Sequence, residues 1–276
     1  MTSMTSAVAA APRAGQGLLT AAARLWWLVT LLGQATFLYY VAGFYGPSTL
    51  TGNFQDWSRN HQLIKGYVAG DTVGNLYFGA HVLLAAVVTF GGTLQMIPQI
   101  RTYAIGFHRW NGRAFMVAAL LGSVTGIWMT WVRGTSGGNI LAAFAISLNG
   151  ALIILFAAVA WSLARRGKIE IHRRWALRLF MVANGVWFLR LGLFGWYSLT
   201  QGVGLTDNLG GPMNYFFDFA CYLLPLAVLE LYLWARDGGG VGGRIMASSA
   251  MLTSTAYMVV GIFGLFMLNR PLMPGL

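Results

Sequence analysis

Residues 139–163 read NILAAFAISLNGALIILFAAVAWSL and contain no charged side chain. A helix of this length, at 1.5 Å per residue, extends about 37 Å and crosses the ~30 Å hydrocarbon core of a bilayer. Further apolar runs of similar length lie at about 25–45, 76–98, 112–132, 178–199, 213–235 and 246–268. The sequence therefore predicts an all-α, polytopic transmembrane helical bundle of about seven spans.

The composition supports a membrane protein and argues against a soluble enzyme. Of 276 residues, 57% are hydrophobic and 9% are charged, whereas soluble domains carry about 25% charged residues. The net charge of +11 lies in short segments between the apolar runs, where cations contact membrane lipid headgroups, so no nucleic acid partner is expected. The single cysteine, Cys221, excludes an intrachain disulfide and a multi-cysteine metal site.

The cations also predict the orientation, because cytoplasmic loops are enriched in Lys and Arg. If the N-terminus is cytoplasmic, four of the 18 cations lie outside, and Arg190 lies within a span. The other cations then lie inside: Arg13, Arg24, Arg101, Arg109, Arg113, Arg165, Arg166, Lys168, Arg173, Arg174, Arg178, Arg236 and Arg244. This asymmetry predicts a cytoplasmic N-terminus and a C-terminus outside.

The chain divides into three expected parts. Residues 1–20 are rich in Ala, Ser, Thr and Gly and are predicted to form a disordered tail. Residues 21–235 are predicted to form a six-helix transmembrane body, with an outer loop cap at 46–75 whose aromatic residues suggest a structured element. Residues 236–276 are predicted to form a flexible Gly-rich loop and a seventh helix that packs onto this body.

Two segments repeat the pattern R-W-x-x-R-x-F, at 109–115 and at 174–180, each just before an apolar run. Each has a histidine immediately upstream, His108 and His172. The echo predicts a parallel repeat of helical hairpins that begin on the same side of the membrane. The alternative is coincidence, because Arg and Trp are generally enriched at membrane interfaces.

The paired histidines predict a haem b site, because a bis-histidine haem is held by one ring from each of two helices. Nearby arginines would hold the propionates and the tryptophans would pack on the macrocycle. The predicted cofactor-binding residues around His108 and His172, the axial ligands, are Arg109, Arg113, Arg174, Arg178, Trp110 and Trp175. The alternative is that these are ordinary interfacial side chains that cap helices or touch lipid phosphates.

A second, outer haem site is conceivable between His81, in the second span, and His61, in the outer loop. The alternative for His81 is a neutral side chain that is hydrogen-bonded inside the bundle.

Three more charges lie within spans. Arg190 and Asp218 are expected to pair, and Glu230 is expected to reach Arg174 or Arg178, because unpaired charges in the membrane are costly. A structural ion-pair role is favoured over a proton pathway.

The pattern H…HRxxGR…HRRWxxR, formed by His81, 108–113 and 172–178, resembles a family of bacterial predicted membrane proteins defined by a domain of unknown function. The resemblance covers about residues 75–200 and implies a bacterial inner (cytoplasmic) membrane. The topology is also distantly similar to transmembrane di-haem cytochromes b of the ascorbate/ferric-reductase type. Those proteins would require a histidine on the fourth span, which residues 140–160 lack.

Three functions are consistent with these features. The first is a cytochrome b-like haem protein that carries electrons between a quinol or small reductant and an acceptor, with a quinone as a partner. The second is a non-catalytic accessory or assembly subunit of a larger respiratory or photosynthetic complex, bound to partner membrane subunits or to copies of itself. The third is a small-solute or proton transporter that uses the charges within the spans.

Overall fold

The computed structural model describes residues 14–59, 66–135 and 138–269, and all regular secondary structure in these ranges is helical. His61 lies outside the described residues. The helices are α1 Gln16–Thr51, η2 Phe54–Arg59, α2 Thr72–Met96, α3 Pro98–Tyr103, α4 Ile105–Val132, α5 Ile140–Arg165, α6 Ile169–Ala183, α7 Gly185–Thr200, α8 Pro212–Asp237 and α9 Gly240–Asn269.

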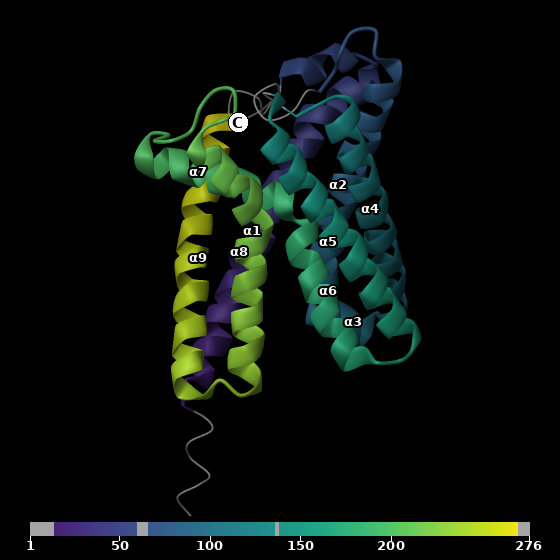
Figure 1. The fold of residues 1–276 in the computed structure, drawn as a ribbon. Helices are drawn as coiled ribbons and strands as arrows, with labels where there is room; N and C mark the ends of the chain where they lie inside the picture. Colours follow the sequence, from purple (N-terminus) through teal and green to yellow (C-terminus); the bar gives the residue numbers. More distant parts are fainter. Residues whose placement is uncertain (1–13, 60–65, 136–137, 270–276) are drawn as a thin grey trace, which may run out of the picture.

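Six of these helices are long and apolar enough to cross a membrane, and the bent pair α6 and α7 makes up to seven spans in the described residues. The expected polytopic helical bundle is therefore confirmed. The orientation of the termini in the membrane stays a prediction. Figure 1 shows the start of α1, helix α3 and the α5–α6 and α8–α9 connections at one end of the bundle, called here the basic end. The end of the described chain lies near the opposite end.

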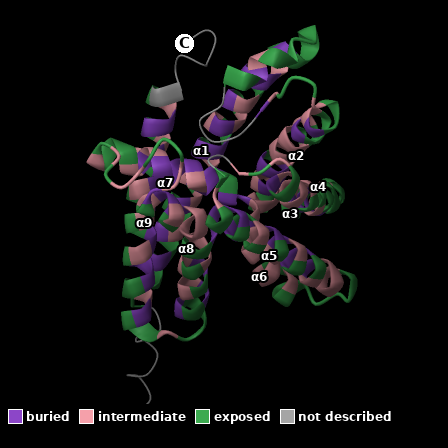
Figure 2. Ribbon diagram, turned by 45° about the horizontal axis from the view of Figure 1, so that its top comes forward, coloured by how far each residue is buried: buried purple, intermediate pink, exposed green. Residues whose placement is uncertain are grey.

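The helices form two groups that stand side by side in Figure 1. One group contains α2, α4, α5 and α6, which pack in that order, and the other contains α8 and α9 with α7 across their far end. Helix α1 packs against both α9 and α2, and α6 packs against α8, so these contacts join the groups. Buried residues gather where helices meet, while exposed residues cover the outer faces (Figure 2). Many of those exposed residues are apolar, as expected for surfaces that face lipid.

Helix α1 is longer than the predicted first span at both ends. It begins at Gln16, so residues 16–20, expected in a disordered tail, are helical. It continues through Pro47 to Thr51, into the segment expected as a loop cap. Beyond it, Trp57 is buried, donates a hydrogen bond from Nε1 to Ser48 Oγ at 3.0 Å and packs against Phe78 of α2. This aromatic packing fixes the cap on the helix ends.

The fifth predicted span is not one continuous helix. Helix α6 ends at Ala183 and α7 begins at Gly185, with a bend of 51° between them. The backbone N–H of Asn184 donates to the Phe180 carbonyl at 3.3 Å, and its side-chain Nδ2 donates to the same oxygen at 2.8 Å, which caps the end of α6. Gly185 allows Asn149 of α5 to approach closely, because a Cβ there would lie 2.8 Å from Asn149 Nδ2. Asn-Gly is a common helix-ending pair.

The last helix makes extensive contacts with the rest of its group. It packs against α1, α7 and α8, and its Ala247, Ser248 and Met251 are buried. It begins at Gly240, so residues 240–244 of the expected flexible loop are helical and only residues 238 and 239 connect α8 to α9. Small side chains on its first turns allow this close approach.

Candidate functional site

The two R-W-x-x-R-x-F segments adopt the same local structure near the starts of α4 and α6. In each, the second arginine stacks on the tryptophan three residues earlier: the guanidinium carbon lies 4.8 Å from the ring centroid for Arg113 on Trp110 and 4.9 Å for Arg178 on Trp175. Residues three apart on a helix lie on the same face, which explains the pairing. The echo therefore encodes one repeated helix-entry structure.

The phenylalanines that end the two segments converge on α2. Phe115 and Phe180 are both buried. A Cβ added to Gly92 would lie 2.9 Å from Phe115 Cε2 and 3.3 Å from Phe180 Cδ2. Gly92 thus lets both rings pack directly against the α2 backbone. These three residues close the deep end of a cavity that opens toward the basic end.

This cavity has a volume of about 1040 Å³ and contains both predicted axial ligands, His108 from α4 and His172 from α6. Its walls come from the end of α2, from α3, from the start of α4, from the end of α5 and from the start of α6. Besides the histidines and the closing residues, the principal lining residues are Gln95, Met96, Arg101, Arg109, Gly112, Arg113, Met116, Trp161, Arg165, Arg173, Ala176 and Leu177. The structure therefore brings the two histidines to one site.

Each histidine is held in a defined way. His172 Nδ1 lies 2.9 Å from the Ala160 carbonyl oxygen of α5, and only a protonated Nδ1 can donate this hydrogen bond. In the neutral ring this arrangement leaves Nε2 as the electron-pair donor, the form in which histidine binds a metal. His108 Nδ1 is buried without a hydrogen-bond partner among the described residues. The backbone of His108 is fixed by Gln95 Nε2, which donates to its carbonyl at 2.9 Å.

The cavity is strongly cationic. Five arginines line it, Arg101, Arg109, Arg113, Arg165 and Arg173, and its lining includes no aspartate or glutamate. Arg173 has an exposed carboxylate partner, Glu170 of its own helix, at 3.3 Å. A cluster of guanidinium groups that is largely without carboxylate partners favours a negatively charged ligand.

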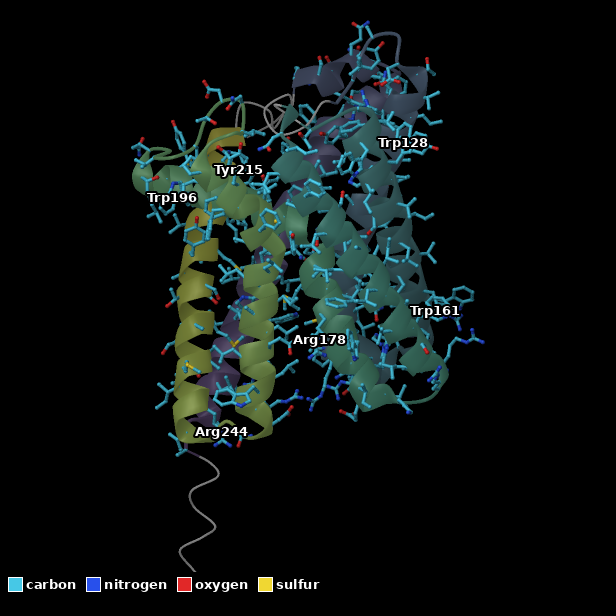
Figure 3. All side chains as sticks on the ribbon, in the orientation of Figure 1. Trp128, Trp161, Arg178, Trp196, Tyr215 and Arg244 are labelled. Atoms are coloured by element: carbon cyan, nitrogen blue, oxygen red, sulfur yellow. The ribbon has the colours of Figure 1, made fainter. Side chains whose placement is uncertain are left out.

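Two of the predicted arginines face elsewhere. Arg178 makes a bidentate ion pair with Glu230 of α8, with N–O distances of 2.6 and 2.7 Å, and Arg174 pairs with Asp237 of α8 at 2.5 Å. Figure 3 shows Arg178 between α6 and α8. The prediction that Glu230 reaches Arg174 or Arg178 is therefore met by Arg178. Arg174 and Arg178 hold the two helix groups together and do not line the cavity.

The reason is a shift of one residue. His108 lies one position before the first arginine of its segment, whereas His172 lies two positions before. One residue turns a helical side chain by about 100°. Both histidines face the same cavity. Arg173, the residue directly after His172, therefore takes the place on α6 that Arg109, the residue directly after His108, takes on α4.

The predicted tryptophans also lie outside the cavity lining. Trp110 is 69% exposed on the outer face of α4. Trp175 packs against Phe156 of α5 at a centroid distance of 5.3 Å, in the adjoining apolar core. Among the described residues, the tryptophan that does line the cavity is Trp161 of α5.

His81 does not belong to this cavity. Its Nδ1 lies 3.3 Å from the Thr125 hydroxyl of α4, and a Cβ added to Gly126 would lie 3.2 Å from its ring. Gly126 thus allows the His81 ring to fit between α2 and α4. Within the described residues, this geometry matches the alternative of a histidine that is hydrogen-bonded inside the helix bundle.

The expected ion pair between Arg190 and Asp218 is not formed. Arg190 is 8% exposed in α7, donates to the Val186 carbonyl at 3.2 Å and lies over the Phe37 ring at 5.2 Å. No carboxylate among the described residues pairs with it. The bend after Ala183 turns α7, so Arg190 faces aromatic residues of α1 and not α8. Aromatic faces stabilise a cation by their electron-rich surfaces.

Several residues of the site were not predicted from the sequence. Gln95, Arg101 and Arg165 line the cavity, and Gly92 closes it. Arg101 and Arg165 had a detectable signal, because both lie in short cationic segments beside an apolar run. Gln95 and Gly92 had none, since a single glutamine or glycine in an apolar run fits many roles.

Residues 78–207 match the family model described as "Predicted membrane protein (DUF2306)". This region of the chain is therefore similar to a membrane protein family of unknown function. It extends from α2 to the connection after α7 and contains every residue that lines the cavity. No curated protein and no solved structure matches the chain.

Proposed function

We propose that this multi-pass membrane protein binds one haem b in the cavity between α4 and α6 and carries electrons between a quinol or small reductant and an acceptor. The observation that carries the proposal is the meeting of His108 and His172, one from each helix, in one large cationic cavity. The family match supports a membrane protein and leaves the cofactor to be tested.

The donor set fits a haem better than a metal ion held by protein alone. Zinc and similar ions need three or four protein ligands, and no group of three His, Cys, Asp or Glu suited to a metal occurs among the described residues. A haem needs only one or two axial ligands, because the porphyrin supplies the others. The Nδ1 hydrogen bond of His172 and the partnerless, buried Nδ1 of His108 suit this role.

The size and charge of the cavity also fit. Its volume of about 1040 Å³ is at the upper end of the roughly 300–1,000 Å³ range of small-molecule and cofactor sites. A haem carries two propionates, and guanidinium groups bind carboxylates through paired hydrogen bonds. Arg101, Arg109 and Arg113 come from α3 and α4, and Arg165 and Arg173 come from α5 and α6, so cations surround the opening.

The chain positions the cofactor and excludes water from it. Phe115, Phe180 and Gly92 close the deep end with apolar surface, and Met116 and Leu179 extend this surface. Ala160 fixes the tautomer and the orientation of the His172 ring. When bound, the haem supplies the one-electron chemistry. The protein sets its ligands, its burial and its local charge, the factors that tune a haem potential.

The test is the absorption spectrum of protein purified from cells with ample haem supply. We expect a Soret band and, on reduction, a sharp α-band. His108→Ala and His172→Ala should each remove most of the bound haem, because each deletes one of two axial ligands. His81→Ala is the matched control and should leave haem content unchanged, because His81 contacts Thr125 outside the cavity.

A folded, colourless protein under these conditions would refute the haem proposal. An equal loss of haem in all three variants would also refute it, since a specific site should distinguish His81 from the other two. A colourless result would favour the accessory or assembly subunit, with partner membrane subunits bound through the exposed aromatic and cationic residues of the basic end.

A further inference from the structure

A second concave site lies on the outside of the same helix group, between α4 and α5. Its volume is about 690 Å³. It is lined by Val117 and Leu120 of α4 and by Ala157, Ala158, Trp161, Ser162, Arg165 and the following Arg166. Figure 3 shows Trp161 on this outer side of the bundle, toward the basic end. We call it the α4–α5 groove.

The groove is cationic at one end. Arg165 is the last residue of α5 and Arg166 is its C-cap, and both are exposed. No carboxylate in the described part of the chain forms an ion pair with either residue. Two adjacent guanidinium groups without a protein partner favour an anionic ligand with several acceptor oxygens, such as a phosphate.

Apart from Ser162, the rest of the groove lining is apolar. Ala157 and Ala158 provide little side-chain volume, so the groove deepens between the larger Val117 and Leu120 of α4 and the ring of Trp161. From Ala157 to Arg165 the groove follows two turns of α5, about 12 Å of helix rise. Because α4 and α5 are predicted to span the bilayer, this apolar part lies at the depth of lipid chains.

We propose that the α4–α5 groove binds one anionic phospholipid. Arg165 and Arg166 contact its phosphate, and one acyl chain lies along Ala158 and Val117. Trp161 sits between the two parts, at the level where aromatic side chains prefer the membrane interface. Basic pockets between transmembrane helices recognise anionic headgroups by this combination of charge and apolar surface. The groove shares Trp161 and Arg165 with the haem cavity, whereas Arg166 and Ala158 line the groove and not that cavity.

Native mass spectrometry of delipidated protein in detergent tests the site. Phosphatidylglycerol and phosphatidylcholine with identical acyl chains are added, and bound lipid is counted. We expect wild-type protein to retain phosphatidylglycerol in preference. Arg165→Gln with Arg166→Gln should lower its affinity by about thirtyfold, because each surface cation contributes about one kilocalorie per mole to anionic lipid binding.

Matched variants separate the site from general surface charge. Arg24→Gln with Arg236→Gln removes two exposed cations from the same end of the bundle, away from the groove, and should leave the preference unchanged. Ala158→Trp should lower the binding of both lipids by filling the apolar part. Arg166→Gln alone should weaken phosphatidylglycerol binding and leave haem content unchanged, so failure of the lipid site is distinguishable from failure of the haem site.

Three results would overturn the proposal. The first is equal binding of the two lipids by wild-type protein. The second is an equal loss of the preference in the two double variants. The third is wild-type binding of phosphatidylglycerol by the Ala158→Trp variant. The first result would favour an uncharged occupant of the groove, such as a quinone. The second would indicate only diffuse attraction between a cationic protein and anionic lipid.

Discussion

A chain of buried polar side chains fixes the bent helix, and Gln34→Leu should weaken it measurably. Gln34 of α1 is 1% exposed and donates from Nε2 to Asn184 Oδ1 at 2.9 Å. Its own Oε1 accepts a hydrogen bond from the Thr93 hydroxyl of α2. Leucine has a similar size but no polar group. The change therefore removes both hydrogen bonds and leaves the Asn184 carbonyl oxygen buried without that donor.

The expected loss follows from these two bonds. Side-chain hydrogen bonds between transmembrane helices contribute on average about 0.6 kcal/mol, and up to about 1.7 kcal/mol. Two bonds therefore give a loss of about 1–3 kcal/mol in the free energy of unfolding. The Thr93 hydroxyl keeps its hydrogen bond to the Thr89 carbonyl at 2.8 Å, which places the loss in the lower half of this range.

The assay is reversible unfolding in mixed micelles with increasing denaturing detergent. Gln99→Leu, an exposed residue of α3, is the matched control and should stay within about 0.5 kcal/mol of wild type. In a double-mutant cycle, Asn184→Leu should cost less in the Gln34→Leu background than in wild type, because the shared bond is already gone. Additive losses, or a Gln34→Leu effect no larger than the control, would refute the reasoning.

Three further outcomes are expected. Gly92→Leu should remove haem, because the new side chain meets the Phe115 and Phe180 rings and forces them to move at the closed end of the cavity; unchanged Soret absorbance in the variant would contradict this. Arg178→Ala and Glu230→Ala should show a coupling of about 1 kcal/mol in a double-mutant cycle, since the pair is bidentate and partly exposed; zero coupling would remove its role between α6 and α8. In a cysteine-free background, a cysteine at Ser58 should react with an impermeant thiol reagent in intact spheroplasts and one at Gly167 should not, and the reverse pattern would overturn the orientation.

The sequence alone predicted that the chain is a membrane protein and where its candidate haem site lies. Uncharged runs of span length predict transmembrane helices, because backbone polar groups in lipid must be satisfied within the segment. Six continuous spans confirm this. The histidines were identifiable because His108 and His172 stand before two apolar runs in a chain with four histidines.

The interruption after Ala183 was decided by tertiary contacts. An Asn-Gly pair in an apolar run fits either a continuous helix or a break. The hydrogen bond from Gln34 and the close approach of Asn149 to Gly185 favour the break. Arg190 then faces Phe37. The prediction that Arg190 pairs with Asp218 was wrong because it assumed a straight fifth span.

The sequence alone predicts that two cationic, aromatic, histidine-bearing segments begin two membrane helices. The structure adds that each segment stacks an arginine on the tryptophan three residues earlier. Only the tertiary structure decided that Arg109 and Arg113 line the cavity while Arg174 and Arg178 bind α8. Local periodicity fixes which side chains share a face. It does not fix which neighbouring helix that face meets, because packing of distant segments sets the rotation of each helix.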